Sequence, residues 1–274
     1  MKFGICNETF GQWTLDKALA FAREAGYTGW EIAPFMLTDD IFAYSASDRS
    51  SYRKQVEDAG LEIIGLHWLL AKTEGLHLTT MDDSVRQSTS EYLCELARLC
   101  RDLGGSVLVF GSPQQRNFPD DQSADSAMEN AAQVLRSVVP ELEKQSVKIA
   151  IEPLGRGEGN FLNEASDGRK LQAMVGSPHV QLHLDVKAMS DEPTPTPQVI
   201  RDNAEAMLHF HANDPNRQGP GMGDVDFVPI FEALKDTHYE GWVSVEVFDY
   251  TLGVERLVTE SMSNMQAAAK QAGL

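Results

Sequence analysis

Four side chains that could bind a metal recur at regular intervals in the second half of the chain. Glu152, Asp185, His211 and Glu246 each stand near the end of a short apolar run. The intervals between them, 33, 26 and 35 residues, are close to the roughly 30 residues of one strand-and-helix unit. Any one of these carboxylates alone could be a loop hydrogen-bond partner or a helix cap. Four in the same register indicate a common site.

The elements that must position these side chains follow an alternating pattern. Apolar runs typical of strands alternate with amphipathic helical segments, which predicts a parallel sheet with crossover helices. The helical segments include 15–25, 52–59, 83–103 and 231–234, each followed by glycine and a strand. We expect eight strands, at residues 2–6, 29–32, 61–67, 106–110, 148–152, 180–185, 207–212 and 242–247.

Eight such units predict a (β/α)8 TIM barrel that forms one domain over residues 1–274. An open doubly wound sheet is the alternative, but the loop after the first strand, residues 7–11, lacks the glycine fingerprint that binds phosphate in that fold. The stretch 191–197, rich in proline and threonine, is interpreted as a rim loop after the sixth strand.

Charge and composition restrict the partners. Asp and Glu number 41 against 23 Lys and Arg, for a formal charge of -18, and the basic residues form no cluster. Such a surface repels nucleic acid and anionic membranes. Three irregularly spaced cysteines predict free thiols, and no apolar run is long enough to span a membrane. We expect a cytoplasmic protein that acts on a small molecule; whether it forms a homo-oligomer stays open.

A parallel barrel carries its active site at the carboxyl ends of the strands, where the four residues are expected to meet. Three carboxylates in one pocket repel one another unless a cation lies among them. Oxygen-rich ligands with one imidazole suit a fairly hard ion better than a structural zinc. We therefore expect one divalent metal ion, with Mn²⁺ the first choice and Mg²⁺ or Co²⁺ the alternatives.

Three motifs then give a family resemblance. They are Glu152-Pro-Leu-Gly-Arg-Gly-Glu158 with Leu162-Asn163, His209-Phe-His211 followed by Asn216-Arg217 and Pro220-Gly-Met-Gly223, and the last strand from Gly241 to Glu246. Together they resemble the sugar isomerases and epimerases with a xylose-isomerase-like barrel, above all the ketose 3-epimerase branch typified by D-tagatose and D-psicose 3-epimerases. The N-terminal half resembles this family only in its rhythm of strands and helices.

The resemblance implies a reaction and a role for each residue. A metal held by Glu152, Asp185, His211 and Glu246 would chelate two neighbouring oxygens of an open-chain ketose. Glu152 and Glu246 would be catalytic and face opposite sides of the carbon beside the carbonyl, one removing its proton and the other returning one through an enediolate. Glu158 and Arg217 would bind hydroxyls near the carbonyl end of the substrate.

One position departs from the branch. Where the epimerases have a histidine three residues after the strand-six aspartate, this chain has Ala188. Either Lys187 or another group at the rim replaces the histidine, or the reaction differs. His67 and Trp68, at the end of the third strand, are further candidates for substrate binding, although His67 could equally be a core histidine.

Two interior histidines and three other functions complete the hypotheses. His183 and His209 are expected as satisfied interior residues rather than ligands. A metal-dependent lyase or dehydratase, which eliminates water or an aglycone from a keto sugar or 3-keto glycoside, is the main alternative function. An abasic-site endonuclease would need a histidine-rich three-metal cluster and a basic groove, against seven histidines and a charge of -18 here. A non-catalytic sugar-binding barrel is the last alternative.

Overall fold

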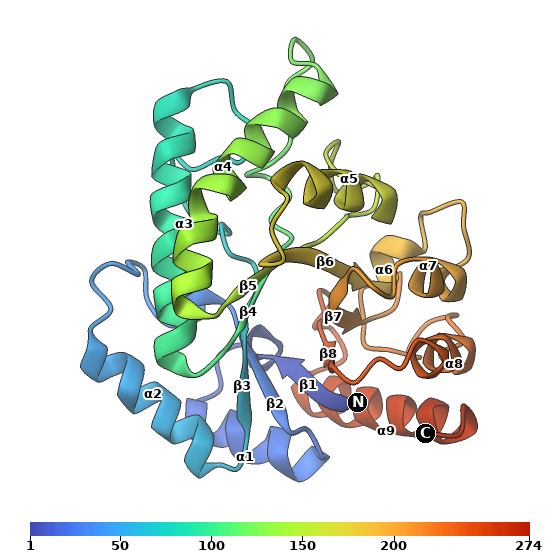
Figure 1. The fold of residues 1–274 in the computed structure, drawn as a ribbon. Helices are drawn as coiled ribbons and strands as arrows, with labels where there is room; N and C mark the ends of the chain where they lie inside the picture. The colour runs from blue at the N-terminus through green and yellow to red at the C-terminus, as the bar shows by residue number, and fades with distance from the viewer.

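The computed structural model describes residues 1–274, and its eight strands are all parallel and close into a barrel surrounded by helices (Figure 1). Each strand pairs with the next along the chain, and β8 pairs with β1 to close the ring. The predicted TIM barrel is therefore confirmed. The strands are β1 (Lys2–Cys6), β2 (Gly29–Ile32), β3 (Glu62–Leu66), β4 (Val107–Phe110), β5 (Lys148–Ile151), β6 (Val180–Asp185), β7 (Met207–Ala212) and β8 (Trp242–Val245).

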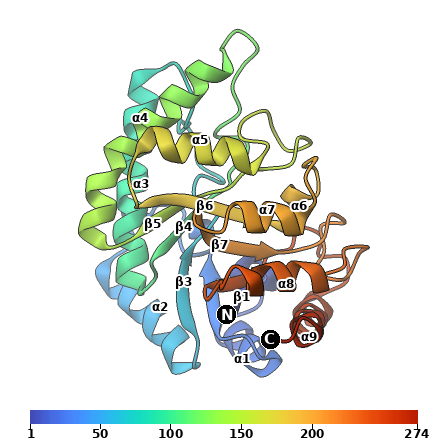
Figure 2. The same cartoon turned by 45° about the vertical axis from the view of Figure 1, so that its right-hand side comes forward.

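The helices lie around the strands on the outside, as the turned view in Figure 2 shows. They are α1 (Leu15–Ala25), α2 (Ala46–Asp58), α3 (Asp83–Leu103), α4 (Ala124–Gln145), α5 (Ala165–Val175), α6 (Val186–Met189), α7 (Thr196–Asp202), α8 (Val228–Asp236) and α9 (Val254–Gln271), with two short 3-10 helices, η1 (Asn7–Phe10) and η2 (Pro34–Met36). None of them is long and apolar enough to cross a membrane.

Local sequence explains where these helices begin and end. The side chain of Asp82 caps the first turn of α3, and Gly104 ends the helix in the left-handed conformation that glycine adopts without strain. The predicted helix 52–59 covers only the second half of α2, whose polar first half begins at the cap Ser45 and carries little apolar periodicity. The predicted rim loop 191–197 is shorter than expected, because its last two residues begin α7.

The barrel interior is polar near the carboxyl ends of the strands. On β2 the indole of Trp30 donates to the hydroxyl of Tyr52 on α2, so the next side chain, Glu31, points the other way, into the barrel. His183 and His209 are buried there as well. Close strand packing needs Gly65 on β3, because a Cβ there would lie 1.9 Å from the carbonyl oxygen of Val107.

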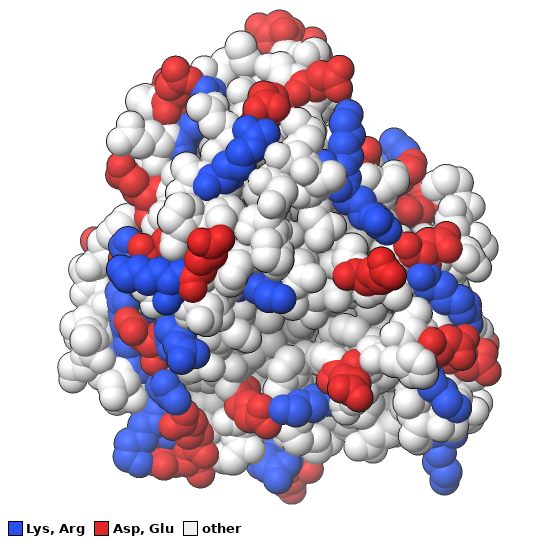
Figure 3. Space-filling model, in the orientation of Figure 1, with Lys and Arg blue, Asp and Glu red and all other residues white.

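The surface carries mixed charges. Figure 3 shows Lys and Arg interspersed with Asp and Glu over the face drawn, around a central area with few charged side chains. Ion pairs such as Lys54 with Asp58 and Arg256 with Glu260 link neighbouring turns of the outer helices. The acidic residues therefore largely coat the helices, as ordinary solvated surface.

Candidate active site and metal centre

A cleft of about 330 Å³ opens at the carboxyl ends of the strands. It is lined by residues from the loops after β3, β4, β5, β7 and β8, among them Trp68, Glu152, Glu158, Arg217 and Glu246. Five of the residues expected to form the site thus border one hollow.

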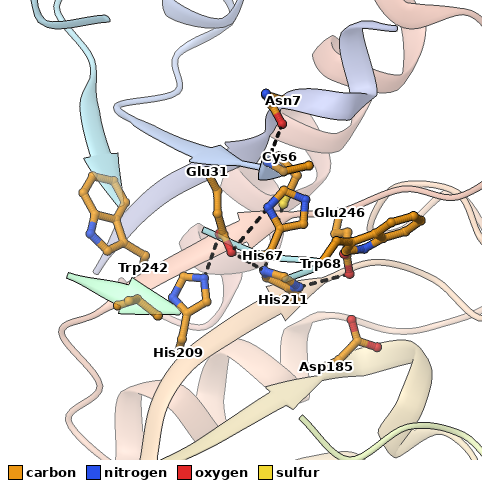
Figure 4. A network of polar contacts seen from close by, with 12 residues as sticks. Cys6, Asn7, Glu31, His67, Trp68, Asp185, His209, His211, Trp242 and Glu246 are labelled. Carbon is orange, nitrogen blue, oxygen red and sulfur yellow. Dashed lines mark hydrogen bonds and ion pairs between the residues drawn. The ribbon is translucent and has the colours of Figure 1, made fainter. Parts of the chain in front are cut away.

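The four predicted ligands lie close to one another, and two of them, Glu152 and Glu246, line this cleft. Glu152 directly follows β5, Asp185 ends β6 and His211 lies on β7. One donor atom from each of these three, and one from His183, all fall within 4.8 Å of one another. Glu246, just after β8, places its Oε2 3.0 Å from Nδ1 of His211 (Figure 4). The structure therefore brings together all four predicted ligands and adds His183 as a neighbour.

The electrostatics of these buried carboxyl groups test whether a cation fits. Burial raises the pKa of Glu152 well above its ordinary value, and the charges of Glu246 and Asp185 raise it further. Burial also raises the pKa of Asp185, although Lys187 opposes this. A divalent cation would remove this repulsion, and three carboxylates with one imidazole form a donor set that hard divalent ions accept. The residues present therefore fit such an ion.

Asp185 is held in place by groups of the chain itself. Its Oδ1 accepts the backbone N–H of Ala188 at 2.8 Å, and its Oδ2 accepts Nδ2 of Asn213 at 2.6 Å. Asn213 is fully buried just after β7, and its own oxygen accepts the backbone N–H of Lys187. Ala188 therefore contributes a backbone hydrogen bond at the position where the resemblance predicts a histidine side chain.

Glu246 is held from the other side by Trp68. The indole Nε1 donates to Oε1 of Glu246 at 2.6 Å, and the ring stacks on Phe248 with centroids 5.9 Å apart. Burial alone would raise the pKa of Glu246, but His211 and then His67 and Trp68 lower it below its ordinary value. Trp68 has φ of 53°, a left-handed conformation that is uncommon for a bulky residue and concentrates at functional sites. The contact of Trp68 with a substrate stays a prediction. The contact of Trp68 with Glu246 was not predicted from the sequence.

The other predicted substrate residues lie at different depths. Glu158 and Arg217 line the cleft, and Lys187 places Nζ 2.5 Å from Oε2 of Glu158. His67 is fully buried, with Nε2 2.8 Å from Oε2 of Glu8. Lys187 and His67 are not among the residues that line the cleft, so their roles toward a substrate stay predictions.

The two interior histidines differ from each other. His209 is satisfied as expected, because its Nε2 lies 2.8 Å from Oε2 of Glu31. His183 is buried as expected, but neither of its ring nitrogens has a partner. Its ring stands edge-on to that of His211 at 4.2 Å, and burial holds the pKa of His183 well below its ordinary value. It is therefore a neutral neighbour of the predicted ligands.

Three supporting residues were missed by sequence reasoning. Glu31, Asn213 and Arg116 each hold a predicted ligand or its backbone. Arg116, in the loop after β4, is buried, donates Nη1 to the carbonyl oxygen of Glu152 at 2.6 Å, and has its pKa lowered to about 10 by burial. Glu31 carried a usable signal, since an acidic residue within an otherwise apolar strand must face a polar partner. The loop position of Arg116 carried none.

Comparisons with known proteins agree with this arrangement. A family model described as xylose isomerase-like TIM barrel matches residues 19–268. An L-ribulose 3-epimerase from Mesorhizobium japonicum is 29% identical over 272 residues, which cover 96% of this chain and 84% of the relative. A 3-dehydro-D-guloside 4-epimerase from Escherichia coli is 24% identical over 255 residues, covering 90% of this chain and 92% of the relative.

Solved structures resemble the fold over nearly its whole length. The crystal structure of D-psicose 3-epimerase with D-tagatose, from Clostridium cellulolyticum H10, superposes with a TM-score of 0.86. The two chains are 20% identical, and the match covers 98% of this chain and 99% of the other. At this identity the likeness concerns the fold.

Proposed function

We propose, from the premise that this chain belongs to the xylose isomerase-like TIM barrel family, that it is a divalent-metal-dependent epimerase or isomerase of keto sugars. The reaction would move a proton at the carbon next to the ketose carbonyl. The observation that carries the proposal is the pair Glu152 and Glu246, which line the same cleft. Oε2 of Glu246 lies 3.0 Å from Nδ1 of His211, and an oxygen of Glu152 lies within 4.8 Å of a ring nitrogen of His211.

The carboxylates would handle the proton. A C–H bond beside a carbonyl is weakly acidic, so a positioned carboxylate can remove its proton and a second one, across the carbon, can return a proton to the opposite face. Of the three carboxylates that line the cleft, Glu152 and Glu246 are the two that lie beside His211. Arg116 and Trp68 hold the backbone of Glu152 and the side chain of Glu246, which fixes the direction of each carboxylate.

Further residues would bind and enclose the sugar. Glu158 and Arg217, at the edge of the cleft, offer an acceptor and a donor for sugar hydroxyls. Nζ of Lys187 donates to the carboxylate of Glu158 and lies 4.7 Å from the ring centroid of Phe248. The ion pair with Lys187 holds the Glu158 carboxylate in place. Trp68 and Phe248 also line the cleft and would offer apolar surface to the C–H groups of a sugar.

The cofactor would be one divalent ion, held by Glu152, Asp185, His211 and Glu246. Such an ion, Mn²⁺ in the first place and Mg²⁺ or Co²⁺ otherwise, supplies charge that stabilises an enediolate formed beside the carbonyl. Relatives named as L-ribulose 3-epimerase and 3-dehydro-D-guloside 4-epimerase support a keto sugar or 3-keto glycoside as the substrate.

The test is solvent exchange with product identification. The protein is incubated with Mn²⁺ in D₂O together with L-ribulose, D-psicose, D-tagatose or a 3-keto glycoside, and the sugar is analysed by NMR. We expect one deuteron at the carbon beside the carbonyl and an epimer or isomer with the same carbon skeleton. Absence of exchange with every sugar, by protein that is folded and loaded with metal, would refute the proposal.

A lyase remains the second candidate because of Ala188. Its methyl group is almost fully buried and its backbone N–H is engaged by Asp185, so this position supplies no acid for the substrate oxygen. Enediolate formation without efficient return of the proton favours loss of a β-substituent. A dehydrated or cleaved product in the same NMR experiment, with no epimer, would favour the lyase.

A further inference from the structure

We infer that Glu31 is a positioning residue for the metal site, which holds His211 in the orientation that directs Nδ1 toward the carboxylate cluster. The inference rests on the proposed function, since it concerns the ion that the four residues would bind. Glu31 lies on β2, outside the four strands β5 to β8 that carry or precede the predicted ligands.

The two nitrogens of His211 face different groups. Nδ1 lies 3.0 Å from Oε2 of Glu246, on the side of the predicted ligands, and Nε2 lies 3.0 Å from Oε1 of Glu31 (Figure 4). A neutral imidazole that gives one nitrogen to a metal carries its proton on the other nitrogen, and that N–H needs an acceptor. In this geometry Nδ1 serves the ion and Nε2–H donates to Glu31.

Glu31 is the one strong acceptor within hydrogen-bond distance of Nε2 of His211. Apart from Glu31, the atom recorded near Nε2 of His211 is the Sγ of Cys6 at 4.0 Å, and a thiol is a weak acceptor. The ring of His211 is fully buried, so water offers no ready substitute. Without the Glu31 carboxylate the imidazole would lose the partner that fixes its tautomer and its rotation.

The Glu31 carboxylate is itself fixed at both oxygens. Oε2 lies 2.8 Å from Nε2 of His209, two residues before His211 on the same strand, and Oε1 lies 3.0 Å from His211. The backbone of β2 is fixed by Trp30, whose indole is tied to α2. Nδ1 of His67 also lies 4.0 Å from Oε1 of Glu31. A buried carboxylate surrounded by these imidazoles is held in one orientation, and this fixes the orientation of His211.

The experiment measures Mn²⁺ affinity directly, by titration followed through the electron paramagnetic resonance signal of free Mn²⁺. We expect Glu31→Met to weaken binding about 10- to 100-fold, the usual effect of removing a partner that orients a metal ligand. Glu31→Gln keeps one acceptor oxygen of similar shape and should recover part of the loss. The matched control is Glu95→Met on α3, which removes a carboxylate paired with Arg49 of α2 and with Arg98, and which should leave Mn²⁺ affinity unchanged.

A double-mutant cycle separates positioning from general damage. If Glu31 acts through His211, adding Glu31→Met to His211→Ala should change the remaining weak affinity, measured at millimolar Mn²⁺, by about twofold or less. Asn213→Ala, which acts through Asp185, should still add its own loss in the His211→Ala background. Thermal unfolding of the metal-free variants checks that each protein is folded.

The outcomes distinguish this inference from the proposed function. Wild-type affinity in folded Glu31→Met, or a Glu31 effect that persists undiminished in the His211→Ala background, would overturn the inference and leave the metal site standing. A wild-type protein that binds none of Mn²⁺, Mg²⁺ or Co²⁺ would overturn the metal site of the proposed function, and the inference with it.

Discussion

Gly111, in the loop after β4, sets the room available to Glu152, and replacing it with alanine gives a sharp test of the site. A Cβ at this position would lie 1.6 Å from Oε2 of Glu152. A carbon and an oxygen need about 3.3 Å, so the carboxylate would have to move by roughly 1.7 Å. The backbone of Gly111 is not in the left-handed region, and the atom in the way is the end of a flexible side chain. We therefore expect Gly111→Ala to fold normally and to displace Glu152.

The size of the effect follows from that displacement. A misplacement of about 1 Å in a reacting group costs on the order of 100-fold in rate, or about 2.7 kcal/mol of transition-state stabilisation. We expect kcat/KM for deuterium exchange to fall by about 100-fold or more, with thermal unfolding within a few degrees of wild type. Gly157→Ala is the matched control, since it lies on the loop after β5 and its added Cβ meets nothing within 4 Å. Near wild-type exchange by Gly111→Ala would refute the assignment of Glu152 as an acid or base.

Three further predictions follow from contacts in the site and on the barrel wall. Wild-type protein should contain about one divalent ion per chain after mild purification, and His211→Ala or Glu246→Gln should lose it; elemental analysis that finds all three metal-free would contradict the metal site. Trp68→Phe removes the 2.6 Å hydrogen bond to Glu246 and keeps an aromatic ring, and should lower kcat/KM about 10- to 100-fold, since a hydrogen bond to a charged group contributes about 1.5–3 kcal/mol; unchanged kinetics would dismiss this role. Arg49→Met removes one of the two arginine partners of the mostly buried Glu95 and should lower the free energy of unfolding by about 1.5–3 kcal/mol, as measured by urea denaturation, without affecting metal content.

The ring of strands was predictable because apolar runs and glycine stops recur with the period of the fold. The strands β1, β2, β6 and β7 have the predicted bounds, and the other four are shorter by one or two residues at one or both ends. Those residues include Glu152 and His67, which belong to the rim rather than to the ladder. Polar side chains at strand ends are a signal for function, but they blur the boundary of the strand.

The predicted ligands could be found because each is a metal-binding type at a strand end. The residues that hold these ligands in place could not be found in the same way, because the hydrogen bond between Glu31 and His211, for example, joins residues 180 positions apart. No local pattern encodes such a contact. Trp68 shows a further limit. An aromatic residue at the rim of a barrel indicates a sugar-binding role, but the indole N–H of Trp68 points toward Glu246 because of a backbone angle that cannot be read from the sequence.

The pairing of β1 with β8 has a consequence for folding. The predicted ligands come from the last four strands, while Glu31 and Trp68 come from β2 and from the end of β3. These two groups meet only once the ring is closed, so the site depends on the contacts of greatest sequence separation, which are expected to form late. An ion that binds the closed ring and not the open chain would stabilise it by mass action. Metal binding would then stabilise the closed barrel in addition to its role in the reaction.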